Sequence, residues 1–276
     1  MEQVQTTMQA QFPVMCQCTD RESLSEHDKL EMCRRGQRFK ERVYVPPQEK
    51  EGECPLCGGV GYRFYWYDGY EYAEPCDCFA KIQSDQSVKR AGIKRDMTFG
   101  NFYTDKPFQK GIKEKAMQYV QEGYLAGQWF FIGGQVGCGK THICTAIVRE
   151  LASKGSQCRY MTWRNEAVQL KSMVNEHEEY HFKLMELCNT PVLYIDDLFK
   201  TQAGQMPTQA DVNLAFQIIN HRYLDANKVT IISCEYDSNQ LLDIDEATGS
   251  RIIEKSKAYL VNVTRNRDKN YRLRNN

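Results

Sequence analysis

One glycine-rich segment constrains this chain more than any other: Gly134-Gln135-Val136-Gly137-Cys138-Gly139-Lys140-Thr141. It matches the pattern G-x-x-x-x-G-K-[S/T] and lies between an apolar run typical of a buried strand (129–134) and an amphipathic run typical of a helix (141–155). Glycines in such a turn let backbone N–H groups converge on phosphate oxygens, and the helix that follows adds its positive N-terminal end. We therefore predict that residues Gly134 to His142 bind the phosphates of a nucleotide.

Two residues of this segment have distinct predicted roles. Lys140 supplies a positive charge for the β- and γ-phosphates, and the Thr141 hydroxyl is a ligand for Mg²⁺. The metal also needs an acid, and the apolar run 191–196 ends in Asp196-Asp197. We predict that Asp196 holds the hydrated Mg²⁺ and that Asp197 orients the water that attacks the γ-phosphate.

Three further residues are candidates for contacting the γ-phosphate. Ser233 and Glu235 lie at the end of the apolar run 229–234, where a polar residue can sense that phosphate, although both are also ordinary turn residues. Arg251 follows a Gly-Ser pair that is expected to open a helix. An arginine there can stabilise charge on the nucleotide of a neighbouring subunit, and the alternative is a solvated side chain.

Strand-like and helix-like runs alternate from residue 98 to residue 265. Strands are expected at 129–134, 158–163, 191–196, 229–234 and 259–264, with helices at 141–155, 165–176, 181–189 and 211–227. Such alternation predicts an α/β fold with a parallel sheet covered on both faces.

The cysteines suggest a second, smaller module at residues 50–80. Of the twelve cysteines, Cys54, Cys57, Cys76 and Cys78 have the spacing C-x₂-C-x₁₈-C-x-C, which suits four thiolates around a structural Zn²⁺. The aromatic run between the pairs predicts a β-hairpin turning at Asp68-Gly69, and hence a zinc ribbon. An iron–sulfur cluster is the alternative. A second metal site that contains Cys16, Cys18 and Cys33, with a fourth ligand such as His27, is an alternative that the sequence leaves open.

The remaining segments are polar. Residues 1–49 are expected to contain a helix over 23–43 that binds a partner, and 81–97 to form a helix or linker. The formal net charge is zero, so DNA contact requires a local basic patch. Residues 251–276 hold eight Lys or Arg and two Asp or Glu, a net charge of +6, and the basic tail 266–276 is the candidate patch. Without a signal-like or membrane-spanning run, we expect a cytoplasmic protein.

The motifs together resemble those of the DnaC/DnaI-type helicase loaders. The resemblance covers about residues 50–265 and rests on CPLCGG…CDC, RDMTFGNF, GGQVGCGKTH, YIDDLFK, QIINHRY, IISCEY and IDEATGSRIIEKS, in that order. It implies an AAA+ ATPase domain with a five-stranded parallel sheet of order 5-1-4-3-2, binding ATP. It also implies a partner, the replicative hexameric DNA helicase, which the protein would help to place on single-stranded DNA, and self-association on ATP.

Carried over by position, the resemblance assigns Lys140 and Thr141 to the Walker A motif and Asp196 and Asp197 to Walker B. Ser233 to Glu235 match sensor I, and Arg251 matches the arginine finger. Residues Thr98, Phe99 and Phe102 resemble the segment near the adenine. Glu235 stands where the family usually has asparagine, which predicts weak or altered hydrolysis.

Two alternatives share the nucleotide site and differ in function. One is an IstB-like ATPase that delivers a transposase to DNA, against which the zinc ribbon argues. The other is a non-hydrolysing ATP-binding scaffold or helicase regulator, for which Glu235 is the hint.

Overall fold

The computed structural model describes residues 43–45, 54–67, 70–93, 96–201 and 205–273. The chain divides into two compact units, Met1–Gln83 and Ser84–Asn276, which are described separately below. Most of the helix expected over 23–43 lies outside the described residues, as do Cys16, Cys18 and Cys33.

The first unit contains a small antiparallel sheet. Its strands are β1 (Val43–Val45), β2 (Tyr62–Tyr67) and β3 (Tyr70–Pro75), in the order β1-β2-β3. The predicted hairpin is β2 and β3, which pair in register with Phe64 opposite Ala73. Val43–Val45 form a strand where the sequence analysis expected a helical segment, because Val-Tyr-Val suits a pleated strand that can pair with β2.

Helix α3 (Phe79–Arg90) begins in the first unit and ends in the second. It occupies most of the segment 81–97, for which a helix or linker is expected. The helix is largely polar, and its Val88 side chain is buried in the core of the second unit. Ala91 and Ile93, just after the helix, join the same core.

The second unit is built on a parallel sheet of five strands. These are β4 (Phe130–Gly134), β5 (Cys158–Thr162), β6 (Val192–Leu198), β7 (Val229–Cys234) and β8 (Leu260–Val263). Their order is β5-β6-β7-β4-β8. Numbered within this sheet and taken from β8, the order is 5-1-4-3-2, which confirms the predicted α/β fold.

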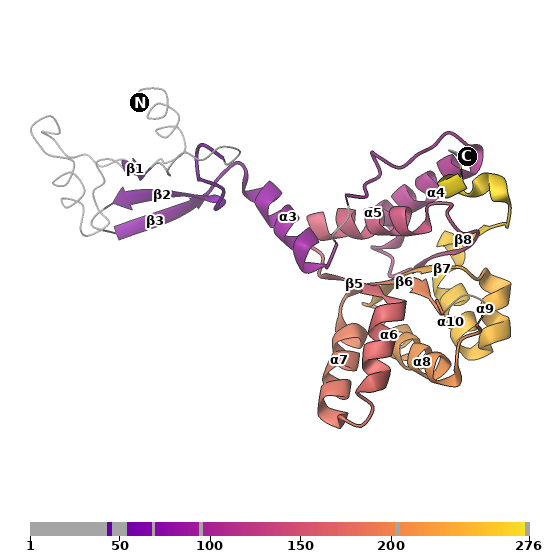
Figure 1. Cartoon of the computed structure of the whole chain (residues 1–276). Helices are drawn as coiled ribbons and strands as arrows, with labels where there is room; N and C mark the ends of the chain where they lie inside the picture. Colours follow the sequence, from indigo (N-terminus) through magenta and orange to yellow (C-terminus); the bar gives the residue numbers. More distant parts are fainter. Residues whose placement is uncertain (1–42, 46–53, 68–69, 94–95, 202–204, 274–276) are drawn as a thin grey trace, which may run out of the picture. The chain divides into compact units, whose positions relative to one another are not determined.

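Helices cover both faces of this sheet (Figure 1). On one face α5 (Lys140–Ser153) contacts β5, β6 and β7, and α4 (Pro107–Gln118) packs on α5. The other face is covered by α6 (Trp163–Ser172), α8 (Gln209–Tyr223) and α10 (Glu246–Ser256), with α7 (His177–Asn189) beside α8 and α9 (Ser238–Ile244) beside α10. Every residue of β4 and β7 is buried. The glycine-rich segment 134–141, the P-loop, follows β4 and is therefore held by a rigid part of the sheet.

Short helical turns complete the second unit. They are a π-helical turn η2 (Tyr119–Gly123) and the 3₁₀ turns η3 (Lys257–Tyr259), η4 (Arg267–Lys269) and η5 (Tyr271–Leu273). Neither α4 with η2 nor α9 is among the elements expected from the sequence.

Helix α10 begins earlier than expected. It starts at Glu246, because the Asp245 side chain caps it by accepting the N–H of Thr248 at 2.9 Å. Gly249 therefore lies inside the helix rather than opening it. A Cβ at Gly249 would meet the backbone of Leu241 at 3.1 Å, so glycine there permits the close approach of α9.

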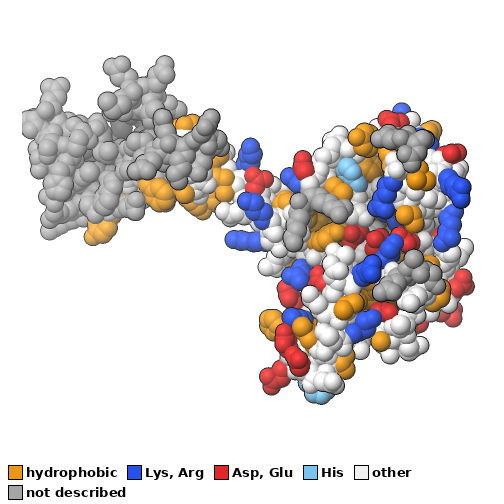
Figure 2. Space-filling model, in the orientation of Figure 1, with side chains coloured by type: hydrophobic (Ala, Val, Ile, Leu, Met, Phe, Trp, Pro, Cys, Tyr) orange, Lys and Arg blue, Asp and Glu red, His pale blue; other side chains and the backbone are white. Residues whose placement is uncertain are grey.

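The visible face of the second unit carries basic and acidic side chains interspersed, in keeping with the formal net charge of zero (Figure 2). Within the described part of the chain, every helix is too short or too polar to cross a membrane.

Candidate nucleotide site and metal centre

The glycine-rich segment forms a compact loop between β4 and α5. Its glycines adopt positive φ angles, 102° at Gly134 and 100° at Gly139, which other residues rarely adopt. A Cβ at Gly134 would lie 2.2 Å from the carbonyl oxygen of Val263 on β8. The Lys140 ammonium donates to the carbonyl oxygens of Gly134 and Gln135, at 2.9 and 2.7 Å. This geometry is that of a phosphate-binding loop with its lysine held along it.

Asp196 lies at the carboxyl end of β6, buried among hydroxyl groups. Its Oδ1 accepts hydrogen bonds from Thr141 at 3.0 Å, Tyr194 at 2.6 Å and Ser233 at 2.7 Å, and its Oδ2 accepts one from Tyr160 at 2.7 Å. The two residues predicted to bind Mg²⁺, Thr141 and Asp196, are therefore in direct contact. Carboxylate and hydroxyl oxygens are hard ligands of the kind that Mg²⁺ prefers, so this pair fits the ion.

Asp197 adopts an unusual backbone conformation, with φ of 54°. Its N–H donates to Ser233 Oγ at 3.0 Å, and the pairing of β6 with β7 is irregular between Ile195 and Leu198. Burial, and then the charge of Asp196, raise the pKa of its carboxyl. The strained turn presents Asp197 to the pocket while Asp196 stays behind it.

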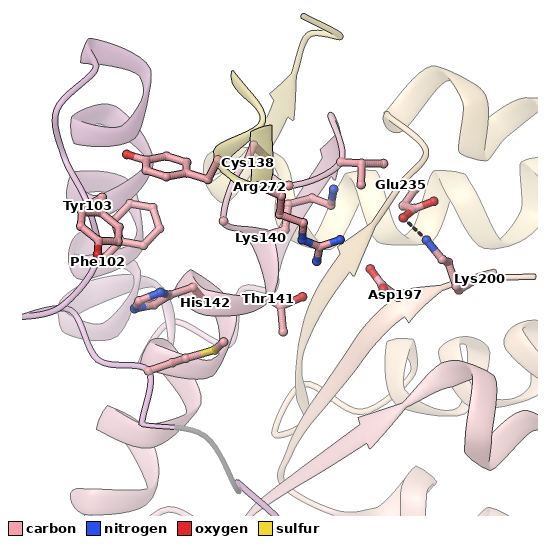
Figure 3. A pocket seen from close by; sticks show the side chains of 15 residues that line it. Phe102, Tyr103, Cys138, Lys140, Thr141, His142, Asp197, Lys200, Glu235 and Arg272 are labelled. Carbon is pink, nitrogen blue, oxygen red and sulfur yellow. Dashed lines mark hydrogen bonds and ion pairs between the residues drawn. The ribbon is translucent and has the colours of Figure 1, made fainter. Parts of the chain in front are cut away.

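A pocket of about 320 Å³ opens in front of the loop (Figure 3). Its lining includes Val136, Gly137, Cys138, Gly139, Lys140, Thr141, His142, Asp197 and Glu235 among the predicted site residues. Gly134, Gln135, Asp196 and Ser233 are not part of this lining, and Ser233 is fully buried. The volume is within the range of small-ligand sites.

One end of the pocket is aromatic. Met97, Phe102 and Tyr103 line it together with His142, whose ring meets Phe102 edge-on at 5.2 Å between centroids. His142 Nε2 lies 3.0 Å from the carbonyl oxygen of Thr98 and so ties the loop to this segment. Thr98 and Phe99, grouped with Phe102 in the sequence analysis, are not part of the lining.

Two parts of the pocket were not found from the sequence. Lys200 lines it and is paired with Glu235, and Tyr271 and Arg272 line it from the C-terminal segment. The signal for Lys200 is its place three residues after Asp197 in YIDDLFK. The C-terminal residues carry no comparable local signal.

The segment 266–273, expected as a basic tail, packs on the loop. Tyr271 donates its N–H to the Gly137 carbonyl at 2.9 Å, and its ring stacks on Tyr103 with centroids 5.4 Å apart. A Cβ at Gly137 would lie 1.9 Å from Asn270 Oδ1, so only glycine admits this contact. Figure 3 shows Arg272 reaching from this segment toward the loop.

Arg251 lies apart from the lining of the pocket, on α10. Its guanidinium donates to the Ala247 carbonyl at 2.6 Å and lies over the rings of Phe216 and Tyr223, 5.2 and 5.5 Å from their centroids. A residue that acts on a neighbouring subunit's nucleotide is expected away from its own pocket, so this position is compatible with the assigned role.

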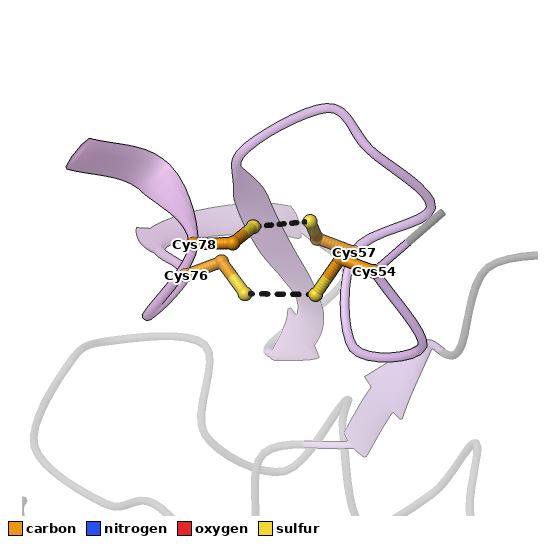
Figure 4. Close-up of side chains that lie close together, drawn as sticks. All are labelled: Cys54, Cys57, Cys76 and Cys78. Carbon is orange, nitrogen blue, oxygen red and sulfur yellow. Dashed lines mark hydrogen bonds between the residues drawn. The ribbon is translucent and has the colours of Figure 1, made fainter. Parts of the chain in front are cut away.

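The four predicted metal ligands of the first unit lie together (Figure 4). Their sulfur atoms are all within 4.8 Å of one another, and the distances are 3.8 Å for Cys54–Cys76 and 3.2 Å for Cys57–Cys78. Zn–S bonds of about 2.3 Å in a tetrahedron place sulfurs about 3.8 Å apart. The cluster thus fits a Zn²⁺ ion.

Local contacts favour the thiolate of Cys57, whereas burial raises the pKa of Cys76 and the hydrogen bond with Cys57 raises the pKa of Cys78. Burial raises the pKa of the Cys57 thiol, but hydrogen bonds from Cys78, the Gly61 N–H and the other two cysteines outweigh it and lower the pKa to about 7. The Gly61 N–H lies 3.4 Å from Cys57 Sγ, and positive φ angles at Gly58, Gly59 and Gly61 give the loop its knuckle shape.

The family resemblance of this chain lies in the second unit. The family model described as the bacterial DnaA ATPase domain matches residues 93–255. The YqaM protein of Bacillus subtilis strain 168 is 34% identical over 220 residues, which cover 75% of this chain and 68% of that protein.

Two solved structures share the fold. A crystal structure of the DnaC helicase loader superposes with a TM-score of 0.50 and 20% identity, over 62% of this chain and 97% of that one. A structure of the replication initiator DnaA bound to AMPPCP and single-stranded DNA superposes with a TM-score of 0.51 and 19% identity, over 64% of this chain and 52% of that one. At these identities the likeness concerns the fold.

Proposed function

Because this chain belongs to the family of the bacterial DnaA ATPase domain, an AAA+ family of replication initiation, we propose that it is an ATP-dependent helicase loader. It binds the replicative DNA helicase and assists its deposition on single-stranded DNA. The observation that carries the proposal is a pocket lined by the glycine-rich loop, Lys140 and Asp197 in one unit, together with a four-cysteine cluster in the other unit.

The extent of the matches supports a loader rather than an initiator. The ATPase unit accounts for 97% of the DnaC helicase loader chain but only 52% of the DnaA chain.

Different residues of the pocket have different roles in ATP binding and hydrolysis. The loop N–H groups and Lys140 bind the phosphates, while Thr141 and Asp196 hold Mg²⁺, which would neutralise phosphate charge. Asp197, presented by its strained turn, orients the attacking water. Met97, Phe102 and Tyr103 supply the apolar surface that a base requires.

The client and the DNA are assigned to other surfaces. We assign the helicase to residues 1–49 together with the four-cysteine unit, and single-stranded DNA to the basic residues toward the C-terminus. Arg251 acts on the nucleotide of a neighbouring copy, so ATP promotes self-association.

ATP hydrolysis by the full chain is the first test. We expect DNA-stimulated phosphate release that Lys140→Ala lowers about 100-fold, with Asp197→Asn keeping nucleotide affinity but losing turnover. Binding of ATP without any phosphate release would favour the non-hydrolysing scaffold instead.

Helicase capture is the second test. The tagged full chain, with ATP, is expected to retain the cognate replicative helicase. A variant lacking residues 1–83, which keeps Val88, Ala91 and Ile93 in the core of the second unit, is expected to lose it. Equal capture by both would contradict the division of labour between the units, and capture of a transposase instead would favour the IstB-like alternative.

A further inference from the structure

A lysine–glutamate pair lies inside the nucleotide pocket, and the roles assigned under the proposed function use neither of its side chains. Lys200 Nζ donates to Glu235 Oε1, joining the segment after β6 to the segment after β7 (Figure 3). Both side chains are about a third exposed, at 33% and 29%, and both line the pocket with Lys140 and Asp197. The pair therefore faces the space in which the phosphates would lie.

The backbone holds Lys200 in this place. Phe199, just before it, has a positive φ of 62° and is 1% exposed, packed edge-on against Trp163 with centroids 5.7 Å apart. The Lys200 N–H donates to the Asp197 carbonyl at 2.9 Å, which closes the turn. Non-glycine residues adopt such φ angles only where their surroundings compel them, and they concentrate at functional sites. The turn that presents Asp197 thus also presents Lys200.

Electrostatics explain why the two charges occur together. A lone carboxylate at Glu235 would repel the phosphates of ATP, and the Lys200 ammonium offsets that charge. Lys140, in contrast, is committed to the carbonyl oxygens of the P-loop. Two lysines line the pocket, Lys140 and Lys200. Lys200 is the one that is paired with a carboxylate, that of Glu235, and phosphate repels this carboxylate.

We propose that Lys200 is a ligand of the terminal phosphate, which Glu235 holds in the empty pocket and releases when ATP binds. The γ-phosphate replaces the carboxylate as the partner of the ammonium, so that ATP opens the link between β6 and β7 and ADP leaves it closed. The proposal rests on ATP binding at the P-loop and adds a residue that distinguishes ATP from ADP.

The test is a set of ATP and ADP affinities of the full chain, measured by calorimetry with Mg²⁺. Lys200→Ala is expected to weaken ATP binding about tenfold and ADP binding less than about twofold. Glu235→Gln, which frees the ammonium, is expected to strengthen ATP binding and to leave ADP binding unchanged. Lys183→Ala, in the exposed Lys183–Glu179 pair of α7, is the matched control and should change neither.

The double variant Lys200→Ala/Glu235→Gln separates ligation from simple charge balance. If Lys200 contacts the phosphate, the double variant still binds ATP more weakly than the unaltered chain, although removal of the lone Glu235 carboxylate restores part of the affinity that Lys200→Ala loses. If Lys200 only neutralises Glu235, the double variant regains the ATP affinity of the unaltered chain, and the proposal is overturned. An unaltered chain that binds neither nucleotide would instead refute the proposed ATPase function.

Discussion

Single hydroxyl groups decide how Asp196 is held. Four of them, on Thr141, Tyr160, Tyr194 and Ser233, converge on its carboxylate at 2.6 to 3.0 Å. The sequence predicts Asp196 and Thr141 as metal ligands from their motifs. It places Ser233 on the γ-phosphate, whereas the structure places this hydroxyl between Asp196 and the Asp197 N–H.

Arg222 shows a charged residue with a structural role. It is fully buried, and its guanidinium donates to Thr230 Oγ1 and to the carbonyl oxygens of Leu187, Cys188, Thr190, Pro191 and Val229. Burial lowers the pKa of this guanidinium to about 10, so it stays protonated at neutral pH. One side chain therefore ties the end of α7 to the starts of β6 and β7.

Removing that guanidinium should destabilise the second unit. Arg222→Met leaves buried carbonyl oxygens without donors, and we expect the free energy of unfolding to fall by about 3 kcal/mol. Urea unfolding followed by circular dichroism measures it. Arg164→Met, at an exposed arginine of α6, is the control, and equal losses in the two variants would contradict the role of Arg222.

At the scale of elements, the four-cysteine unit has few aliphatic residues to hold it. In the part of this unit that the structure describes, the buried hydrophobic side chains are those of Tyr65, Cys57 and Cys76, which form a small core. We therefore expect a structural metal to be the main source of its stability.

Metal removal is expected to unfold this unit and spare the other. The purified chain should contain one Zn²⁺, and chelation or Cys57→Ser should expose the first unit to proteolysis while ATP affinity is unchanged. Cys158→Ser, at a half-buried cysteine of β5 outside the cluster, is the control. Visible absorption from iron would favour the iron–sulfur alternative, and an intact unit after chelation would refute a structural metal.

The C-terminal segment is an element whose role depends on its packing. Charge composition predicts a basic tail for DNA, yet Asn270, Tyr271 and Arg272 lie on the P-loop and its pocket. The segment therefore belongs to the nucleotide site at least as much as to a DNA surface.

Nucleotide affinity tests this contact. Arg272→Ala is expected to weaken ATP binding about three- to tenfold, because it removes a positive charge from the pocket. Arg267→Ala, on η4 of the same segment but outside the lining, should leave ATP binding unchanged. Calorimetry measures the ATP affinity of the two variants. If neither variant loses ATP affinity and both lose DNA affinity equally and in a salt-sensitive way, the segment serves DNA binding alone.

At the scale of the whole molecule, Arg251 is the residue that we propose to link nucleotide binding to assembly. It lies away from its own pocket, on a helix that packs against α8 and β4. A role in a neighbouring copy's site follows from this placement only if copies associate.

Self-association should therefore control hydrolysis. In the full chain, turnover per molecule is expected to rise with protein concentration, and Arg251→Ala to lower it at least about tenfold without changing ATP affinity. Lys255→Ala is the control, since Lys255 lies over the same Tyr223 ring at 5.4 Å. Sedimentation with an ATP analogue measures assembly, and turnover that is independent of concentration would contradict the role.

The sequence by itself determined the parts of this protein that are local. The P-loop, the paired acids and the cysteine spacing are each contained in short segments whose chemistry requires particular residues at particular intervals. The alternation of apolar runs likewise determined the parallel sheet, because strand and helix periods are local properties.

Only the tertiary structure decided which distant residues complete the site. Lys200 and Glu235 are 35 positions apart in the sequence, and Tyr160 and Asp196 are 36 positions apart. Gly137 and Asn270 are in contact although most of the sequence of the ATPase unit lies between them. No periodicity joins such residues. They meet because parallel strands bring their carboxyl ends to one edge of the sheet, and the chain after β8 returns over that edge.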